Sequence, residues 1–187
     1  AEFANHITPQ NVYLFVSNER EKLAGFDRVF LSDHPGEKHL MRPDASPVPL
    51  WLAHEDLHGP RTEPNINPHF LNAACKLLAK PFMPDALSVA EDLFFHILAV
   101  LWSPAYRTEN EAALRQDWPR VPVPADAGIL EASAQLGRTV ADLLLPDKPV
   151  QGVTTGRLRA ELRTLAVPSK VGGKPIEEPA DTKVEAG

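Results

Sequence analysis

The sequence predicts an α+β fold in which an N-terminal β-rich region packs on a C-terminal helical region. Short apolar runs bounded by turn residues fill the first part of the chain, and a helical spacing of apolar residues replaces them near residue 63. The 187 residues, 43% hydrophobic and 24% charged, have an ordinary globular composition. We expect a strand and loop region over residues 1–62, a helical region of the same domain over 63–167, and a flexible tail or truncated edge over 168–187.

Three runs predict the strands of the first region. Residues 12–16 are apolar and aromatic, and residues 28–31 are followed at once by a turn-rich segment. Residues 48–52 form the third run, and Pro49 within it places that strand at a sheet edge or at a strand start, because proline cannot donate to a ladder.

The first helix is predicted from Asn67 and Pro68, which suit the cap and the first helical position. The residues that then share one face are Leu71, Ala74, Cys75 and Leu78. Cys75 is the only cysteine, and its place on this face favours packing over a nucleophilic role.

A second helix is predicted between Ser88 and Trp102, where Ser88 and Glu91 have the spacing of a capping box. It is apolar nearly all round, which places it in the centre of the fold. Within this helix residues 93–102 are apolar except for His96, and this run is about half the roughly 20 residues that a membrane span needs. His96, within this run, is expected to be a core imidazole bonded to a carbonyl.

Ser103 and Pro104 predict the start of a more polar helix that continues to about residue 117. Alternating prolines then make residues 118–124 extended. Asp126 is expected to cap a last long helix, whose apolar stripe comprises Ile129, Ser133, Leu136, Gly137, Val140, Leu143 and Leu144. One more short helix is expected around Leu158, Leu162 and Leu165.

Charge and cysteine content limit the class of protein. The net charge of −6 argues against adhesion to DNA or membranes over the whole surface, although a basic face stays possible. One cysteine allows no intrachain disulfide, and no signal peptide is recognised, so we expect a cytoplasmic protein without a membrane partner.

The sharpest catalytic pattern is His54, Glu55 and His58, which have the H-E-x-x-H spacing of zinc hydrolases. A third ligand could come from Glu63, His69 or Glu91. The motif needs a helix, however, whereas Pro49 precedes it and Gly59 follows it, which favours a polar turn leaving a strand. We therefore expect no metal and no catalytic residue here, and the zinc hydrolase remains an alternative.

Several phrases of the sequence resemble a known family. They are residues 62–68, residues 91–107 with Ser103-Pro104-Ala105-Tyr106-Arg107 at their centre, and residues 117–122. Over roughly residues 10–170 the chain resembles the C-terminal specificity region of type ISP restriction-modification enzymes. Such enzymes join nuclease, helicase-like ATPase, adenine-N6 methyltransferase and target-recognition parts in one polypeptide.

The resemblance implies a fragment that recognises double-stranded DNA and catalyses nothing itself. The adenine-binding Asn-Pro-Pro-aromatic motif and the glycine-rich nucleotide motifs are not found in this sequence. S-adenosylmethionine, Mg and ATP are therefore implied for the parent enzyme, a site-specific methyltransferase and endonuclease, and no cofactor for this fragment. The implied partners are DNA and the methyltransferase domain of the same parent chain.

The DNA-binding residues are expected on variable loops and on basic side chains that can contact phosphates or base edges. The candidates for base reading are Arg20, Lys22, Lys38, His39 and Arg42, and those for phosphate contact are Arg61, Arg107 and Arg120. Two other interpretations stay open. The basic residues can belong to a solvated face of weak ion pairs, or the chain can be a protein-interaction module with an exposed apolar patch.

Overall fold

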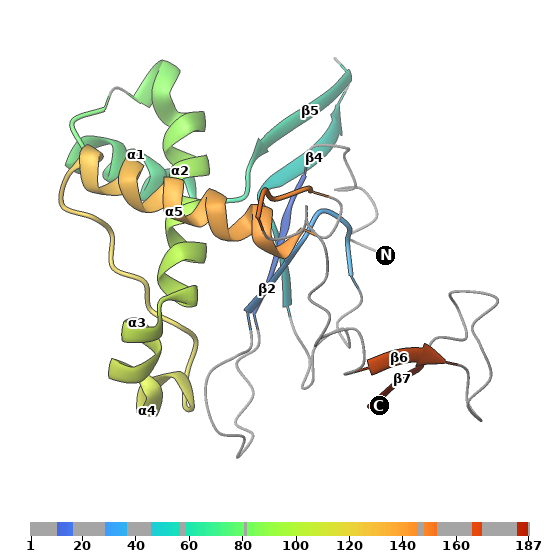
Figure 1. The fold of residues 1–187 in the computed structure, drawn as a ribbon. Helices are drawn as coiled ribbons and strands as arrows, with labels where there is room; N and C mark the ends of the chain where they lie inside the picture. Colours follow the sequence, from blue (N-terminus) through green and yellow to red (C-terminus); the bar gives the residue numbers. More distant parts are fainter. Residues whose placement is uncertain are drawn as a thin grey trace. The chain divides into compact units, whose positions relative to one another are not determined.

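The computed structural model describes residues 11–16, 29–36, 46–56, 59–80, 82–145, 148–152, 166–169 and 183–186 (Figure 1). The chain divides into two compact units, Ala1–Lys148 and Pro149–Gly187, and each is described by itself. In the first unit, small antiparallel sheets are followed along the chain by packed helices. The predicted α+β fold class is confirmed.

The first sheet has three antiparallel strands in the order β2-β1-β3. They are β1 (Tyr13–Val16), β2 (Val29–Ser32) and β3 (Ser46–Pro49). All four side chains of the central strand β1 are buried, with Leu14 on one face and Phe15 on the other. The first two strands are confirmed where the apolar runs predicted them.

The third predicted strand, residues 48–52, is divided at Leu50. β3 ends at Pro49, and β4 (Trp51–Asp56) begins two residues later. The Leu50 amide donates to the carbonyl of Val12 at 2.9 Å, where the chain turns out of the first sheet. One continuous strand was the wrong prediction, because this long-range hydrogen bond has no local signature in the sequence.

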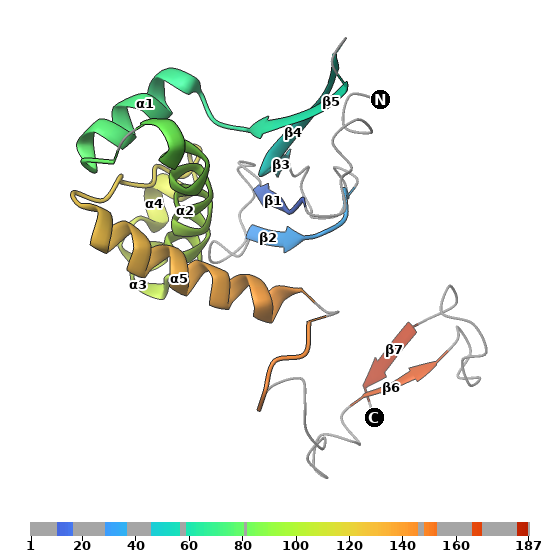
Figure 2. The same cartoon turned by 90° about the horizontal axis from the view of Figure 1, so that it is seen from above.

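β4 pairs with β5 (Gly59–Pro64) in a separate two-stranded antiparallel sheet, here called the β4–β5 ribbon. The buried Asn11 side chain holds its base: the Asn11 amide donates to the carbonyl of Trp51 at 2.8 Å and accepts from the Trp51 amide at 3.0 Å. From this base the ribbon extends away from the helices in both views (Figures 1 and 2).

The first helix, α1 (Pro68–Leu77), begins where the sequence predicts it. The Asn67 side chain accepts hydrogen bonds from the amides of His69 and Phe70 at 2.9 and 3.3 Å. The predicted inward residues Leu71, Ala74, Cys75 and Leu78 are all buried.

The central helix, α2 (Phe82–Trp102), starts earlier than the predicted cap. Ser88 lies inside the helix, so the capping-box prediction was wrong. Pro84 is the third residue of α2, where a missing amide costs no helical hydrogen bond, and so it does not delay the start. α2 packs against α1 and α5, as expected of a helix apolar nearly all round. None of the helices in the described part of the chain combines the length and hydropathy needed to cross a bilayer.

After α2 the chain forms two short helices, α3 (Pro104–Glu109) and α4 (Glu111–Leu114). Ser103 caps α3, as predicted, by accepting from the Tyr106 amide. The single helix predicted to residue 117 is interrupted at Asn110, whose side chain donates to the Tyr106 carbonyl at 2.9 Å. Such side-chain bonds compete with the helical backbone. Residues 118–124 form neither helix nor strand, as their prolines predict.

The last long helix, α5 (Ala127–Leu144), is capped by Asp126, which accepts from the Ile129 amide at 2.9 Å. Its buried face differs from the predicted stripe and comprises Leu130, Ala134, Gly137 and Ala141. Ile129, Leu136 and Leu143 of the predicted stripe are exposed.

Gly137 accounts for this rotation of α5. A Cβ at that position would lie 1.8 Å from the carbonyl oxygen of Phe95 in α2, so the two backbones approach too closely for a side chain. The predicted role of Gly137 in close backbone contact is confirmed. Of the other large side chains of the predicted stripe, Val140 and Leu144 are half-buried against the main core, whereas Ile129, Leu136 and Leu143 point away from it.

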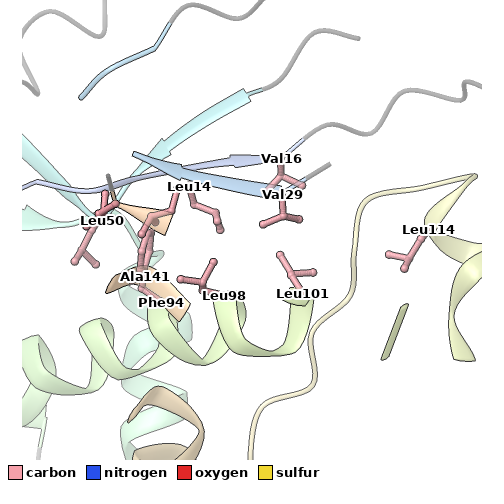
Figure 3. Close-up of a cluster of buried hydrophobic side chains, with 11 residues drawn as sticks. Leu14, Val16, Val29, Leu50, Phe94, Leu98, Leu101, Leu114 and Ala141 are labelled. Carbon is pink, nitrogen blue, oxygen red and sulfur yellow. The ribbon is translucent and has the colours of Figure 1, made fainter. Parts of the chain in front are cut away.

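The main core lies between the first sheet and α2 (Figure 3). Leu14, Val16 and Val29 from the sheet face Leu98 and Leu101 from α2. Burying each such side chain stabilises the fold by roughly 1.5–3 kcal/mol. The sheet and the helices are therefore held together by one continuous apolar contact.

The second unit contains β6 (Ala166–Ser169) and β7 (Lys183–Ala186), which pair antiparallel. Composition predicted no element after residue 168, so this hairpin was not foreseen. The short helix predicted around Leu158, Leu162 and Leu165 lies outside the described residues.

Candidate nucleic-acid interface

Three strand ends meet at one end of the first sheet. Val16, the last residue of β1, pairs with Val29, the first of β2, and with Ser46, the first of β3. The connection from β1 to β2 therefore starts and finishes at this end, whereas the connection from β2 to β3 starts at the opposite end, after Ser32, and finishes at this one. The candidates for base reading all belong to these two connections and lie outside the described residues: Arg20, Lys22, Lys38, His39 and Arg42.

A cluster of polar side chains lies on one face of the β4–β5 ribbon. His54 is paired directly with Arg61, and Leu52 with Glu63, so these residues share a face of the two strands. The Arg61 guanidinium lies 2.6 Å from one carboxylate oxygen of Glu63, and the His54 Nε2 lies 3.1 Å from the other. His54, Arg61 and Glu63 are called the ribbon cluster below.

The ribbon cluster is charged but exposed. The hydrogen bond from Arg61 is the largest influence lowering the pKa of Glu63 below its usual value, and His54 acts in the same direction. The Arg61 side chain is 64% exposed. An ion pair in such surroundings is worth only about 0.2–1 kcal/mol. The guanidinium can therefore exchange the Glu63 carboxylate for another anion, such as a phosphate, at little cost.

The other two candidates for phosphate contact differ from each other. Arg107 is half-buried: its Nε donates to the carbonyl of Leu101 at 2.7 Å, and its guanidinium lies 4.9 Å from the Trp102 ring centroid. Arg120 is 88% exposed and pairs with Asp117 at 2.9 Å. The contacts of Arg107 favour a packing role, whereas Arg120 is available to a ligand.

The segment that carries Arg120 is anchored at two alternate carbonyls. Tyr106 donates its hydroxyl to the carbonyl of Arg120 at 3.0 Å. The Nε2 of His96 lies 2.9 Å from the carbonyl of Pro122, and its Nδ1 lies 2.7 Å from the hydroxyl of Ser133. Because a carbonyl only accepts, Nε2 carries a proton, and in the neutral imidazole Nδ1 then accepts from the Ser133 hydroxyl. His96 is thus a core imidazole bonded to a carbonyl, as predicted.

Two grooves beside the sheets are mostly apolar. One, of about 280 Å³, lies between the first sheet, α2 and residues 118–123, with His96 in its wall. The other, of about 710 Å³, separates the base of the ribbon from the starts of α1 and α2. Neither groove is lined by a lysine or an arginine, so Arg61 and Arg120 remain the candidate anion contacts in the described part of the chain.

The zinc-hydrolase alternative does not fit this geometry. His54 and Glu55 are consecutive residues of strand β4, so their side chains point to opposite faces instead of sharing one face of a helix. Glu63 contacts His54, but His69 and Glu91 belong to α1 and α2. His58 lies outside the described residues. Among the residues that are described, no group of three metal-ligating side chains is found.

Sequence reasoning missed the ribbon cluster. It considered His54 as a metal ligand only in the zinc-hydrolase alternative, with Glu63 as a possible third ligand, and it named Arg61 separately as a candidate for phosphate contact. The available signal was two short polar runs flanking Gly59, which together could have been recognised as a hairpin.

Comparison with known proteins identifies the family. Residues 1–182 match the family described as Type ISP C-terminal specificity domain. No curated protein matches the chain in sequence.

Two solved structures share the fold. The first is described as the ATP-dependent Type ISP restriction-modification enzyme LlaBIII bound to DNA, with 19% identity, a TM-score of 0.56, and coverage of 76% of this chain and 9% of that one. The second is a cryo-EM structure of a DrdV–DNA complex, with 22% identity, a TM-score of 0.57, and coverage of 95% and 18%. The chain thus spans a small part of either protein. With its family match over nearly the whole length, this chain belongs to the Type ISP C-terminal specificity domains.

Proposed function

We propose that this specificity domain recognises a sequence in double-stranded DNA, with the β4–β5 ribbon as one of its contact elements. The ribbon cluster is the observation that carries the proposal. A two-stranded ribbon fits the major groove of B-DNA, where arginine donates to guanine and to the flanking phosphates. Both similar structures are described as DNA complexes, which supports the same partner here.

Within this proposal the arginines have separate tasks. The Arg61 guanidinium gives up its contact with the Glu63 carboxylate and contacts DNA instead. His54 provides a second polar group beside it. Arg120, presented by the anchored segment 118–124, contacts a phosphate. Arg20, Lys22, Lys38, His39 and Arg42, which lie outside the described residues, add base contacts. Arg107 remains a weaker candidate because it would have to leave Trp102 and Leu101.

We further propose that the chemistry belongs to parts of a larger polypeptide. An enzyme that modifies one adenine must flip it out of the duplex, so a separate surface has to read the neighbouring bases. The first similar enzyme is described as ATP-dependent. The attached parts would then use ATP, Mg and S-adenosylmethionine for DNA cleavage and adenine-N6 methylation, and the methyltransferase part is the domain's partner. The single cysteine, which is buried, suits a reducing cytoplasm.

The test is selection of duplexes from a randomised pool by the full-length polypeptide. We expect one sequence motif to be enriched by the wild type and the enrichment to weaken or change in Arg61→Ala. Arg115→Ala is the matched control, because Arg115 is also exposed and paired with a glutamate, but lies directly after α4 and far from the ribbon in the sequence. A pool that is bound yet stays random in sequence would contradict the proposal.

A further inference from the structure

Helix α5 carries an exposed stripe of uncharged side chains, of which the three largest are aliphatic. Ile129, Leu136 and Leu143 are 54%, 65% and 48% exposed. Ala132 and Thr139, which lie between them on the helix surface, are also exposed. The alternating steps of three and four residues give the 3.5-residue period of a coiled-coil seam. These five residues are called the α5 stripe below.

The α5 stripe is distinct from the face that packs on α2. That face is made of Leu130, Ala134, Gly137 and Ala141, all buried. α5 is therefore apolar on two sides. One side packs on α2, and within the described part of the chain the other side is exposed to solvent. From Ile129 to Leu143 the stripe runs about 21 Å along the helix, at 1.5 Å per residue. This length suits one more helix lying alongside.

Charges on α5 do not attract the occupant of the stripe. Its ionised side chains pair with groups of the same unit: Glu131 with Lys80, Arg138 with Asp92, and Asp142 with Lys148. The stripe itself carries no cation to bind phosphate. Its occupant is thus an apolar helix face and not DNA.

The area of the stripe distinguishes a free partner from a tethered one. A stable interface between free proteins buries about 800 Å² on each partner, and three half-exposed aliphatic side chains fall well short of that. A tethered segment needs less area, because the linker raises its effective concentration. In the two similar structures the matched regions are 9% and 18% of the chain, so most of each polypeptide is available to supply such a segment.

We propose that the α5 stripe docks an amphipathic helix from the part of the same polypeptide that lies outside residues 1–187. This inference rests on the proposed function in one respect, the membership of the domain in a larger polypeptide. The docked helix fixes the helical side of the domain to the catalytic parts and leaves the ribbon free for DNA.

The test places a photo-cross-linking amino acid at position 136 of the full-length polypeptide. Leu77, a 58% exposed leucine of α1, is the matched control position. We expect position 136 to form a cross-link within one polypeptide, to a helix outside residues 1–187, with a yield independent of protein concentration and about tenfold above that at position 77. A cross-link to a second copy, to residues 149–187, or at no more than the control yield would overturn the proposal.

A second variant separates docking from DNA recognition. With the cross-linker at position 143, Leu136→Asp should reduce the cross-link about tenfold because it buries a charge in the seam, whereas Leu136→Met should retain it. An unchanged cross-link in Leu136→Asp would also overturn the proposal. If the cross-links form as expected but the duplex selection fails, the proposed DNA function fails and the docking stands. If the cross-links fail to form but the duplex selection succeeds, the docking proposal fails and the DNA function stands.

Discussion

The helical and strand halves of Ala1–Lys148 use their charges differently. In the helical half, Arg138 pairs with Asp92 and Lys80 with Glu131, which links α5 to α2 and to the turn after α1. In the strand half, His54, Arg61 and Glu63 pair among themselves on an exposed ribbon. The pairs of the helical half join different elements. Those of the strand half lie within the ribbon and leave charged side chains exposed to solvent. The comparison favours the proposal in which the helical half, called the helical base below, holds its own elements together while the β4–β5 ribbon contributes a DNA contact.

The largest effect is expected from disturbing the helical base at Gly137. The Cβ in Gly137→Ala would lie 1.8 Å from a backbone carbonyl of α2, so α2 and α5 must separate. We expect a loss of at least about 3 kcal/mol in the free energy of unfolding, measured by denaturant titration.

Gly128→Ala is the control for this substitution. Gly128 is on the same helix but exposed, and an added Cβ would meet only the Asp126 side chain, at 3.3 Å. The change in stability should stay within about 1 kcal/mol. Equal losses in the two variants would break the comparison, because close packing of α2 on α5 would then not be what stabilises the base.

The next effect is expected at His96, which joins three parts of the helical half. His96→Phe removes the hydrogen bonds to Pro122 and Ser133 and should lower the free energy of unfolding by roughly 1–3 kcal/mol. Ser133→Ala removes one of these bonds and should cost less. A His96→Phe variant as stable as the wild type in denaturant titration would show that the two bonds do not hold the segment.

The smallest effect on stability is expected in the strand half, at Glu63. The pKa of Glu63 is lowered in the folded state, so its pair with Arg61 stabilises the fold at pH values above the pKa of the unfolded chain. This stabilisation is lost as the pH falls through the pKa of the folded state, which lies below 4.5. Because the pair is exposed, Glu63→Gln should change stability at pH 7 by no more than about 0.5 kcal/mol.

Glu63→Gln should also change the affinity for DNA, whereas a matched substitution in the helical half should not. Removing the Glu63 carboxylate frees Arg61 and removes one repulsive charge, so Glu63→Gln should bind duplex DNA about two- to fivefold more tightly. Glu111→Gln, which frees Arg115 in the same way on α4, should leave the affinity unchanged. A fluorescence anisotropy titration measures both, and weaker binding by Glu63→Gln would count against the role of Arg61.

The two halves also differ in how far the sequence predicts them. Asn67, Ser103 and Asp126 cap helices as expected, because a cap depends on neighbours a few residues away. The start of α2 was missed because the Ser88 pattern also fits inside a helix. The buried face of α5 was missed because the contact of Gly137 with Phe95 decides it.

In the strand half the decisive contacts are more distant. The division at Leu50 depends on hydrogen bonds to Val12 and from Asn11 to Trp51, across about 40 residues of chain. The ribbon cluster depends on the register that pairs His54 with Arg61. Residue types alone could identify Arg61 and Arg120 as candidates for phosphate contact. They could not show that Arg61 belongs to a ribbon and Arg120 to an anchored segment.

The salt dependence of DNA binding tests the central claim most directly. The logarithm of the binding constant should fall linearly with the logarithm of salt concentration, and the slope should decrease by about one for Arg61→Ala while Arg115→Ala keeps the wild-type slope. Equal slopes for the wild type and both variants, or binding that does not respond to salt, would contradict the proposal that the β4–β5 ribbon contacts DNA.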